Sequence, residues 1–236
     1  MIRLNTRALA ALVALLLFIC PQTSLAQTAP PDQILQWEND IALFDSLNLV
    51  EYADAGTLLV TGSSSIRLWD SIHSDLAPYR VMQRGYGGAK LTDYNYYAER
   101  IIIPQQFKAI VVFVANDIAG VEGDQSPRDV KQLFKDLVKQ VRRRNPGTPL
   151  CWVEVTPTPK RWEQSPQIRE ASMLIEDYCA KQKELHFIST FDQFLSPEGL
   201  PDSTFFRKDM LHLNRRGYMQ WSEIIKASLE EAGIRP

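Results

Sequence analysis

The sequence has few cysteines and histidines, with three of each among 236 residues. They do not form the closely spaced Cys and His pairs that hold a structural zinc ion, so we expect no metal site of that kind. Cys151 falls in a predicted strand and Cys179 in a predicted helix. We therefore expect two buried free thiols rather than a disulfide, because free cysteine behaves as a small buried hydrophobe.

An excess of positive charge is also lacking. The chain carries 26 Lys and Arg against 28 Asp and Glu, which gives a net charge of −2. Binding to a nucleic acid or to an anionic membrane surface would call for a basic patch. The one basic run, Arg142-Arg143-Arg144, closes a predicted helix, where cations suit the helix dipole. We expect no nucleic-acid partner.

Long hydrophobic runs are absent except near the start of the sequence. Ala8 to Cys20 is apolar, but it is shorter than the roughly 20 residues that a membrane-spanning helix needs. Two arginines precede this run, and small residues at positions 24 and 26 resemble a cleavage site. Residues 1–26 are predicted to be a signal peptide, and residues 27–236 a single domain that is secreted or periplasmic, with no stable membrane anchor. The alternative is an uncleaved N-terminal anchor.

Apolar strand patterns alternate with helical patterns about five times along the chain. The strongest strand pattern is the β-branched run 109–115, as expected of a central parallel strand covered on both faces. The other predicted strands are 58–60, 81–82, 150–155 and 185–188. This alternation predicts an α/β fold, a three-layer α/β/α sandwich with a central five-stranded parallel sheet.

Several helix starts are marked by capping residues. Ser126-Pro127 and Ser165-Pro166 each combine a capping serine with a proline suited to the first helical turn, and Asn214 caps a final helix. An earlier helix is predicted from Asp32 to about Leu47, because its apolar residues recur at helical spacing.

Polar and glycine residues follow the predicted strands at their carboxyl ends. They are Ser64, Gly88, Asn116 and the loop Pro157–Trp162. In an open parallel sheet the ligand site lies beyond the carboxyl ends of the strands. One site could therefore collect all four segments.

Four blocks of the sequence together resemble the SGNH hydrolases, also called GDSL-type lipases and acylhydrolases. The blocks are Gly62-Ser63-Ser64-Ser65, Gly85-Tyr86-Gly87-Gly88, Asn116-Asp117 and Asp209-Met210-Leu211-His212. Their order and rough spacing match, and the extended block from Thr61 to Trp69 resembles exported bacterial members. The resemblance implies a flavodoxin-like fold and an ester-cleaving enzyme without metal or organic cofactor.

The same residues suit ester hydrolysis on chemical grounds. A free serine is a weak nucleophile and needs a neighbouring base, which His212 would supply for Ser64. Asp209 could orient the imidazole and stabilise its charged form. The backbone N–H groups of Ser64 and Gly88 and the side-chain amide of Asn116 would form an oxyanion hole. Glycine at position 88 would permit close backbone approach.

Composition alone does not separate Ser63, Ser64 and Ser65; the resemblance selects Ser64, two positions after Gly62. Three departures from the family pattern stand near the site: Gln83, Ala115 and Met210 occupy positions where Asn, Gly and Gly are common. We expect Ala115 to narrow the oxyanion site or shift Asn116.

The remaining polar residues have structural interpretations. We expect His73 and His186 to be structural, Asp117 to hold its loop, and Arg161 and Trp162 to anchor the structure, with contact to substrate as the alternative for the last two. The predicted substrate is a small-molecule or glycan ester with a short acyl group, such as an acetyl ester of a carbohydrate. The alternatives are a catalytically silent carbohydrate-binding module and an acyltransferase that uses a sugar alcohol.

Overall fold

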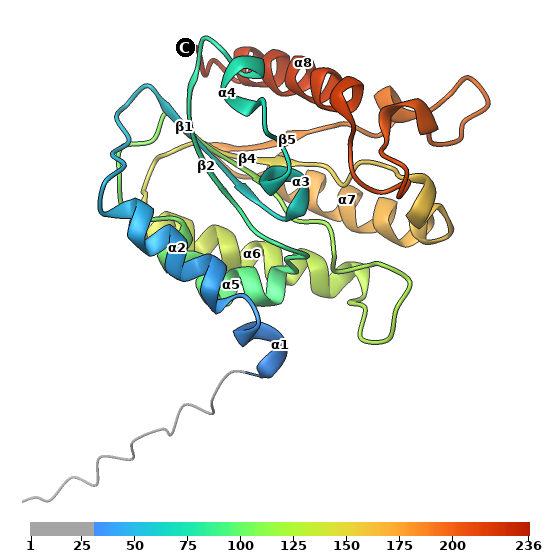
Figure 1. The fold of residues 1–236 in the computed structure, drawn as a ribbon, viewed down its shortest axis with the longest axis horizontal. Coiled ribbons are helices and arrows are strands. Elements are labelled where there is room, and N and C mark those ends of the chain that lie inside the picture. Colours follow the sequence, from blue (N-terminus) through green and yellow to red (C-terminus); the bar gives the residue numbers. More distant parts are fainter. Residues whose placement is uncertain (1–30) are drawn as a thin grey trace, which may run out of the picture. The chain divides into compact units, whose positions relative to one another are not determined.

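The computed structural model describes residues 31–236 (Figure 1). The predicted signal peptide lies outside the described residues. The core of the described part is a five-stranded parallel sheet in the order β2-β1-β3-β4-β5, as predicted. Its strands are β1 (Thr57–Gly62), β2 (Arg80–Gly85), β3 (Ala109–Phe113), β4 (Leu150–Val153) and β5 (Leu185–Ile188).

Helices cover both faces of the sheet, which gives three layers (Figure 1). One face is packed by α2 (Glu38–Asn48), α5 (Leu91–Ile101), α6 (Pro127–Arg144) and α7 (Ser165–Cys179). The other is packed by α3 (Ser64–Arg67), α4 (Ile72–Asp75) and α8 (Arg215–Glu231). The short helix α1 (Asp32–Leu35) precedes α2.

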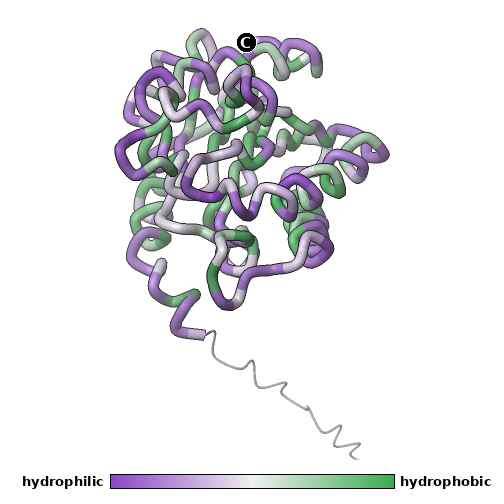
Figure 2. The backbone as a smooth tube through the Cα atoms, turned by 90° about the vertical axis from the view of Figure 1, so that its right-hand side faces the viewer, coloured by the Kyte–Doolittle hydropathy of each residue, from purple (hydrophilic) through white to green (hydrophobic). Residues whose placement is uncertain are grey.

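The strands carry apolar side chains on both faces because both faces are covered. Leu58 and Val60 of β1 point into the core under α8, whereas Leu59 points into the core under α5 and α6. All six residues of β1 are buried. The helices instead alternate along their length, and Figure 2 shows their turns changing between hydrophilic and hydrophobic residues.

The strand order fixes where a ligand can enter. The chain winds outward from β1 in both directions, since β2 and β3 flank it. At such a switch point the connections leave the sheet toward opposite faces, and a crevice opens at the carboxyl ends of the two strands. Here the switch point lies between β1 and β3, the strands that precede Ser64 and Asn116.

Helix starts follow the capping signals in two of three cases. The side chain of Ser126 accepts a hydrogen bond from the Asp129 N–H, and that of Asn214 accepts one from the Gly217 N–H. Ser165 is different, because it is already the first residue of α7 and makes no capping bond. A 3₁₀ helix, η1 (Pro159–Gln164), runs directly into α7 and replaces the predicted cap.

The predicted helix from Asp32 to Leu47 is broken in two. α1 ends at Leu35 and α2 begins at Glu38. Between them the Trp37 ring packs against Tyr86, with 5.5 Å between ring centroids, and against Gly87. Tertiary packing at Trp37 therefore interrupts a segment whose apolar period is continuous.

The structure also bears on the two cysteines and on membrane-spanning helices. Cys151 and Cys179 are both buried and free, as predicted. Among residues 31–236, no helix has the length and apolar character that crossing a membrane would require.

Candidate active site

Gly62 sets the position of Ser64 at the end of β1. Its φ is 140°, a region that favours glycine, and a Cβ there would lie 1.8 Å from the carbonyl oxygen of Phe113. The Ser63 N–H donates to that same oxygen at 2.9 Å. This close approach of β1 to β3 turns the chain out of the sheet, so that Ser64 begins the single turn of α3.

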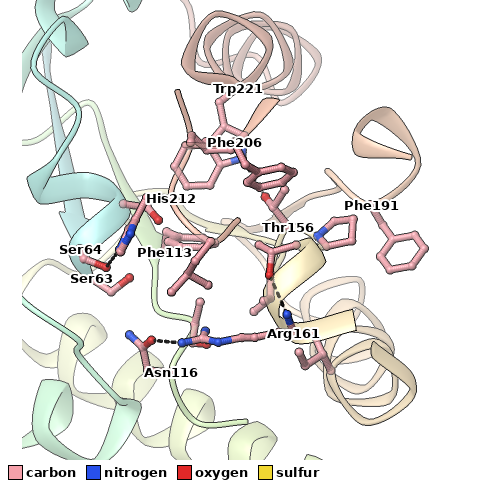
Figure 3. A pocket seen from close by; sticks show the side chains of 18 of the residues that line it. Ser63, Ser64, Phe113, Asn116, Thr156, Arg161, Phe191, Phe206, His212 and Trp221 are labelled. Carbon is pink, nitrogen blue, oxygen red and sulfur yellow. Dashed lines mark hydrogen bonds between the residues drawn. The ribbon is translucent and has the colours of Figure 1, made fainter. Parts of the chain in front are cut away.

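The Ser64 hydroxyl meets an imidazole from a distant part of the chain. Its Oγ lies 3.0 Å from Nε2 of His212 (Figure 3). On the other side of the ring, Nδ1 of His212 lies 2.7 Å from Oδ2 of Asp209. Of the three adjacent serines, only Ser64 is hydrogen-bonded to this ring within the described residues. The geometry thus separates three serines that composition could not distinguish.

Asp209 is held as a carboxylate by several donors. Its Oδ1 accepts hydrogen bonds from the N–H groups of Leu211 and His212, both at 3.0 Å. Partial burial works to raise the pKa of Asp209, but the bonds from the His212 ring and from these two N–H groups outweigh it and lower the pKa to about 2. An ionised Asp209 beside Nδ1 favours the tautomer in which Nε2 is free to accept a proton.

Met210 has a left-handed backbone conformation, which fits the glycine that is common at this position in the family that the sequence resembles. Its φ is 56°, in the left-handed region, which costs a residue with a Cβ roughly 1–2 kcal/mol. The Met210 carbonyl accepts a hydrogen bond from the Lys160 N–H at 3.0 Å. The turn that carries Asp209 and His212 is therefore tied to η1 across the site.

Asn116 presents its side-chain amide at the carboxyl end of β3. Its Nδ2 donates to the Ala89 carbonyl at 2.9 Å, and its Oδ1 accepts from Nη2 of Arg161 at 2.6 Å. The second N–H of the amide donates to no other group within residues 31–236, so it can meet a ligand. Ala115 has no positive φ that would require glycine, and it lines the pocket at Ser64. That it narrows the oxyanion site or shifts Asn116 stays a prediction.

Gly88 lies between β2 and α5, and the oxyanion role of its N–H stays a prediction. A Cβ added to it would meet nothing within 4 Å, and it is not among the residues that line the pocket at Ser64. Close approach instead requires Gly87, where a Cβ would lie 1.8 Å from the Trp37 ring, and Gly85, where it would lie 2.4 Å from the Arg67 nitrogen. Within residues 31–236, the backbone N–H groups of Ser64 and Gly88 donate no hydrogen bond.

A pocket of about 610 Å³, open to solvent, extends from Ser64 and His212. Figure 3 shows Asn116 and Arg161 along one side of it and Phe206 and Trp221 along another, with Phe113 between them. Arg161 and Trp162 both line this pocket. Sequence reasoning missed the other aromatic lining residues, because apolar residues after a strand or within a helix resemble core residues. They are Phe113, Phe191, Phe206 and Trp221.

The other polar residues singled out in the sequence lie outside the pocket lining. His73 is exposed on α4, and His186 lies on β5 with a buried Nε2 that has no partner among the described residues. Asp117 is buried, and its Oδ1 accepts a hydrogen bond from the Leu91 N–H at 2.9 Å. Burial and, secondarily, the charge of Asp93 raise the pKa of Asp117 to about 7. Asp117 therefore anchors the start of α5.

Metal binding finds no support in the part of the chain that the structure describes. No group of three or more His, Cys, Asp or Glu side chains there is arranged to hold an ion. The chemistry available at the pocket is that of a hydroxyl, an imidazole, a carboxylate and amide donors.

The described fold recurs in solved structures. A protein from Streptococcus pneumonia described as a candidate platelet activating factor has 18% identity and a TM-score of 0.73, over 84% of this chain and 95% of that one. A GDSL-like lipase from Bacteroides thetaiotaomicron has 18% identity and a TM-score of 0.64, over 84% and 98%. A carbohydrate esterase family 3 protein from Talaromyces cellulolyticus has 14% identity and a TM-score of 0.57, over 75% and 97%. At these identities the likeness shows the fold alone.

Sequence comparison adds the family. No curated protein matches the chain. Residues 52–220, more than half of the chain, match the model of the GDSL-like lipase/acylhydrolase family. That segment runs from just before β1 into α8 and contains Ser64, Asn116, Asp209 and His212. The protein therefore belongs to the GDSL-like lipase/acylhydrolase family and is an ester-cleaving hydrolase.

Proposed function

We propose that the protein cleaves carboxylic esters with short acyl groups through an acyl-enzyme formed on Ser64. One observation carries the proposal: Ser64 and His212 line a pocket and are hydrogen-bonded at 3.0 Å, and His212 is bonded in turn to Asp209 at 2.7 Å. A serine so placed beside a neutral imidazole is activated for attack on an ester carbonyl.

The first half of the reaction forms the acyl-enzyme. Ser64 Oγ bonds to the carbonyl carbon while Nε2 of His212 takes its proton, and the carbonyl oxygen becomes an oxyanion. The bond to the alcohol oxygen then breaks, and the imidazolium returns the proton to the departing alkoxide. Asp209, ionised because of its lowered pKa, stabilises the imidazolium between these two steps.

The second half repeats the same proton transfers with water. Water gives a proton to Nε2 and attacks the acyl carbon, and the collapse of the new intermediate frees the acid and restores the Ser64 hydroxyl. Each tetrahedral intermediate would be met by the free N–H of Ser64, the second N–H of Asn116 and the N–H of Gly88. One such donor is typically worth a factor of about 10² to 10³ in rate.

The proposed substrate is an acetyl or other short-chain ester of a carbohydrate. Two observations support this substrate class. The pocket has room for a small molecule, and one solved structure with this fold is a carbohydrate esterase. Secretion or periplasmic location is part of the same proposal and rests on the signal-like residues 1–26.

The direct test is hydrolysis of p-nitrophenyl acetate and of acetylated xylan by the purified protein. Ser64→Ala should lower kcat at least about a thousandfold, because removing a nucleophile leaves only binding and the oxyanion hole. Equal activity in the two proteins would exclude Ser64 as the nucleophile. A folded but silent parent protein would favour a glycan-binding role.

A further inference from the structure

Arg161 makes an unusual set of contacts for a charged side chain. Nη1 donates to the Ala115 carbonyl at 2.5 Å and Nη2 donates to Asn116 Oδ1 at 2.6 Å. Among the described residues no carboxylate lies close enough to form an ion pair with it. The two acceptors are neighbours at the carboxyl end of β3, so the planar fork of one guanidinium holds both.

This contact decides which way the Asn116 amide points. A guanidinium carries donors only, so the atom of Asn116 that faces Arg161 must be the oxygen. The amide nitrogen is then turned away from Arg161, where one N–H reaches the Ala89 carbonyl at 2.9 Å. If the amide were flipped, its N–H groups would face the guanidinium. Neither Arg161 Nη2 nor Asn116 Nδ2 would then have its present acceptor.

We propose that Arg161 is a positioning residue for ester hydrolysis, which acts by locking the Asn116 amide so that its second N–H faces the oxyanion. The inference rests on the proposed function of Ser64. It assigns Arg161 a role through Asn116 rather than through direct contact with the substrate.

The surrounding structure holds Arg161 in place for this role. The backbone N–H of Arg161 donates to Thr158 Oγ1 at 3.3 Å at the start of η1. The backbone N–H of the preceding residue, Lys160, donates to the Met210 carbonyl at 3.0 Å. One short segment thus joins the turn of Asp209 and His212 to the amide of Asn116. Figure 3 shows the Arg161 side chain running along the pocket toward Asn116.

The guanidinium charge should also strengthen the Asn116 donor. A cation bonded to the amide oxygen polarises the amide, and hydrogen bonds in a chain strengthen one another by perhaps 10–30% each. Asp117 and Asp124 are the carboxylates whose charges act on Arg161, but neither is paired with it. No direct ion pair among the described residues neutralises the guanidinium, and its positive charge favours an anion forming beyond the amide.

The test measures the rate at which a fluorophosphonate labels Ser64, together with kcat and KM for p-nitrophenyl acetate. Arg161→Met removes both donors with little change in shape, and we expect kcat and the labelling rate to fall about 10- to 100-fold with KM changed less than threefold. Misplacing a catalytic group by about 1 Å can cost 10²-fold. Arg161→Lys should recover only part of the loss, since one ammonium cannot span two acceptors.

The matched control is Lys160→Met, which removes the same charge from the exposed neighbouring position on η1. It should retain parent rates. If Arg161→Met behaves like Lys160→Met while Ser64→Ala abolishes labelling, the proposed function stands and the role of Arg161 is wrong.

A double-variant comparison separates positioning from direct contact. If Arg161 acts through Asn116, adding Arg161→Met to Asn116→Ala should cost less than a further twofold. If the two losses multiply, Arg161 contacts the substrate on its own and the inference is overturned. A parent protein that no fluorophosphonate labels would overturn the proposed function and this inference together. Should Arg161→Met fail to fold, the comparison is made with Arg161→Lys.

Discussion

His212 Nε2 lies 3.0 Å from Ser64 Oγ, although 148 positions separate the two residues in the chain. The fold makes this contact by placing the end of β1 beside the segment that enters α8. The contact between Asp209 and His212 is local, since both residues belong to the same tight turn. The proposed chemistry therefore depends on one long-range contact and one local turn.

Asp209→Asn should lower kcat by at least about a hundredfold. The asparagine amide can donate to Nδ1 of His212, which would leave a proton on Nε2 and prevent it from accepting the Ser64 proton. Circular dichroism would verify folding, and the pH profile of kcat/KM would show the altered histidine. Activity close to that of the parent would mean that the carboxylate does not set the tautomer.

Asp75→Asn should lower stability at neutral pH, and this loss should shrink as the pH falls toward 2. The buried Asp75 carboxylate accepts hydrogen bonds from Arg215, Trp69 and Ser71, which outweigh its burial and lower the pKa to about 2. Because this pKa lies below the usual value of about 3.9, its contribution is complete above pH 4 and disappears as the pH falls through 2.

We expect a difference of about 2 kcal/mol in the free energy of unfolding at pH 7, measured by urea denaturation. The gap between parent and Asp75→Asn should close progressively from pH 4 to pH 2. A gap that is independent of pH would show that the loss comes from packing rather than from the ionised pair with Arg215.

Met210→Gly and Met210→Val should have opposite effects on the turn that carries Asp209 and His212. Glycine relieves the positive φ and should keep activity within a few-fold. Valine, branched at Cβ, fits this conformation poorly and should lower the melting temperature and kcat. Thermal melting and p-nitrophenyl acetate hydrolysis would check both, and equal behaviour of the two variants would count against strain at this position.

Gly87→Ala and Gly88→Ala form a matched pair in the glycine block. A methyl group at position 87 would overlap the Trp37 ring, and such overpacking typically costs about 1–3 kcal/mol. A methyl group at position 88 meets open space, so Gly88→Ala should fold with parent stability. Urea denaturation of both variants is the measurement, and a larger loss for Gly88→Ala would contradict the structure.

Much of the fold follows from patterns that the sequence displays. The strands are marked because a parallel strand covered on both faces must be apolar throughout, as in β3. Ser126 and Asn214 mark helix starts because they bond backbone N–H groups within a few residues. Such local signals do not reveal helix breaks that depend on distant contacts. The break at Trp37 is one, because the Trp37 ring packs against the ring of Tyr86.

The site was predictable to a similar extent. Ser64 and Asn116 both line the pocket because polar residues at strand ends share one edge of a parallel sheet. His212 lines it from the turn before α8, and Asp209 is bonded to the other ring nitrogen of His212. The pocket walls were not predictable, since Phe206 and Trp221 read as ordinary core residues. The hydrogen bond from Arg161 to Asn116 was also not predictable, because it joins η1 to the segment after β3 and no sequence pattern links the two.

The central claim is that Ser64 is the nucleophile, and mapping its covalent label tests it most directly. The parent protein is treated with a fluorophosphonate and the modified peptide is sequenced by mass spectrometry, beside Ser64→Ala and Ser65→Ala. We predict one label on Ser64, none in Ser64→Ala, and labelling largely retained in Ser65→Ala, whose missing hydroxyl has no bond to His212. A label on Ser63 or Ser65 in the parent, or labelling that survives Ser64→Ala, would contradict the account.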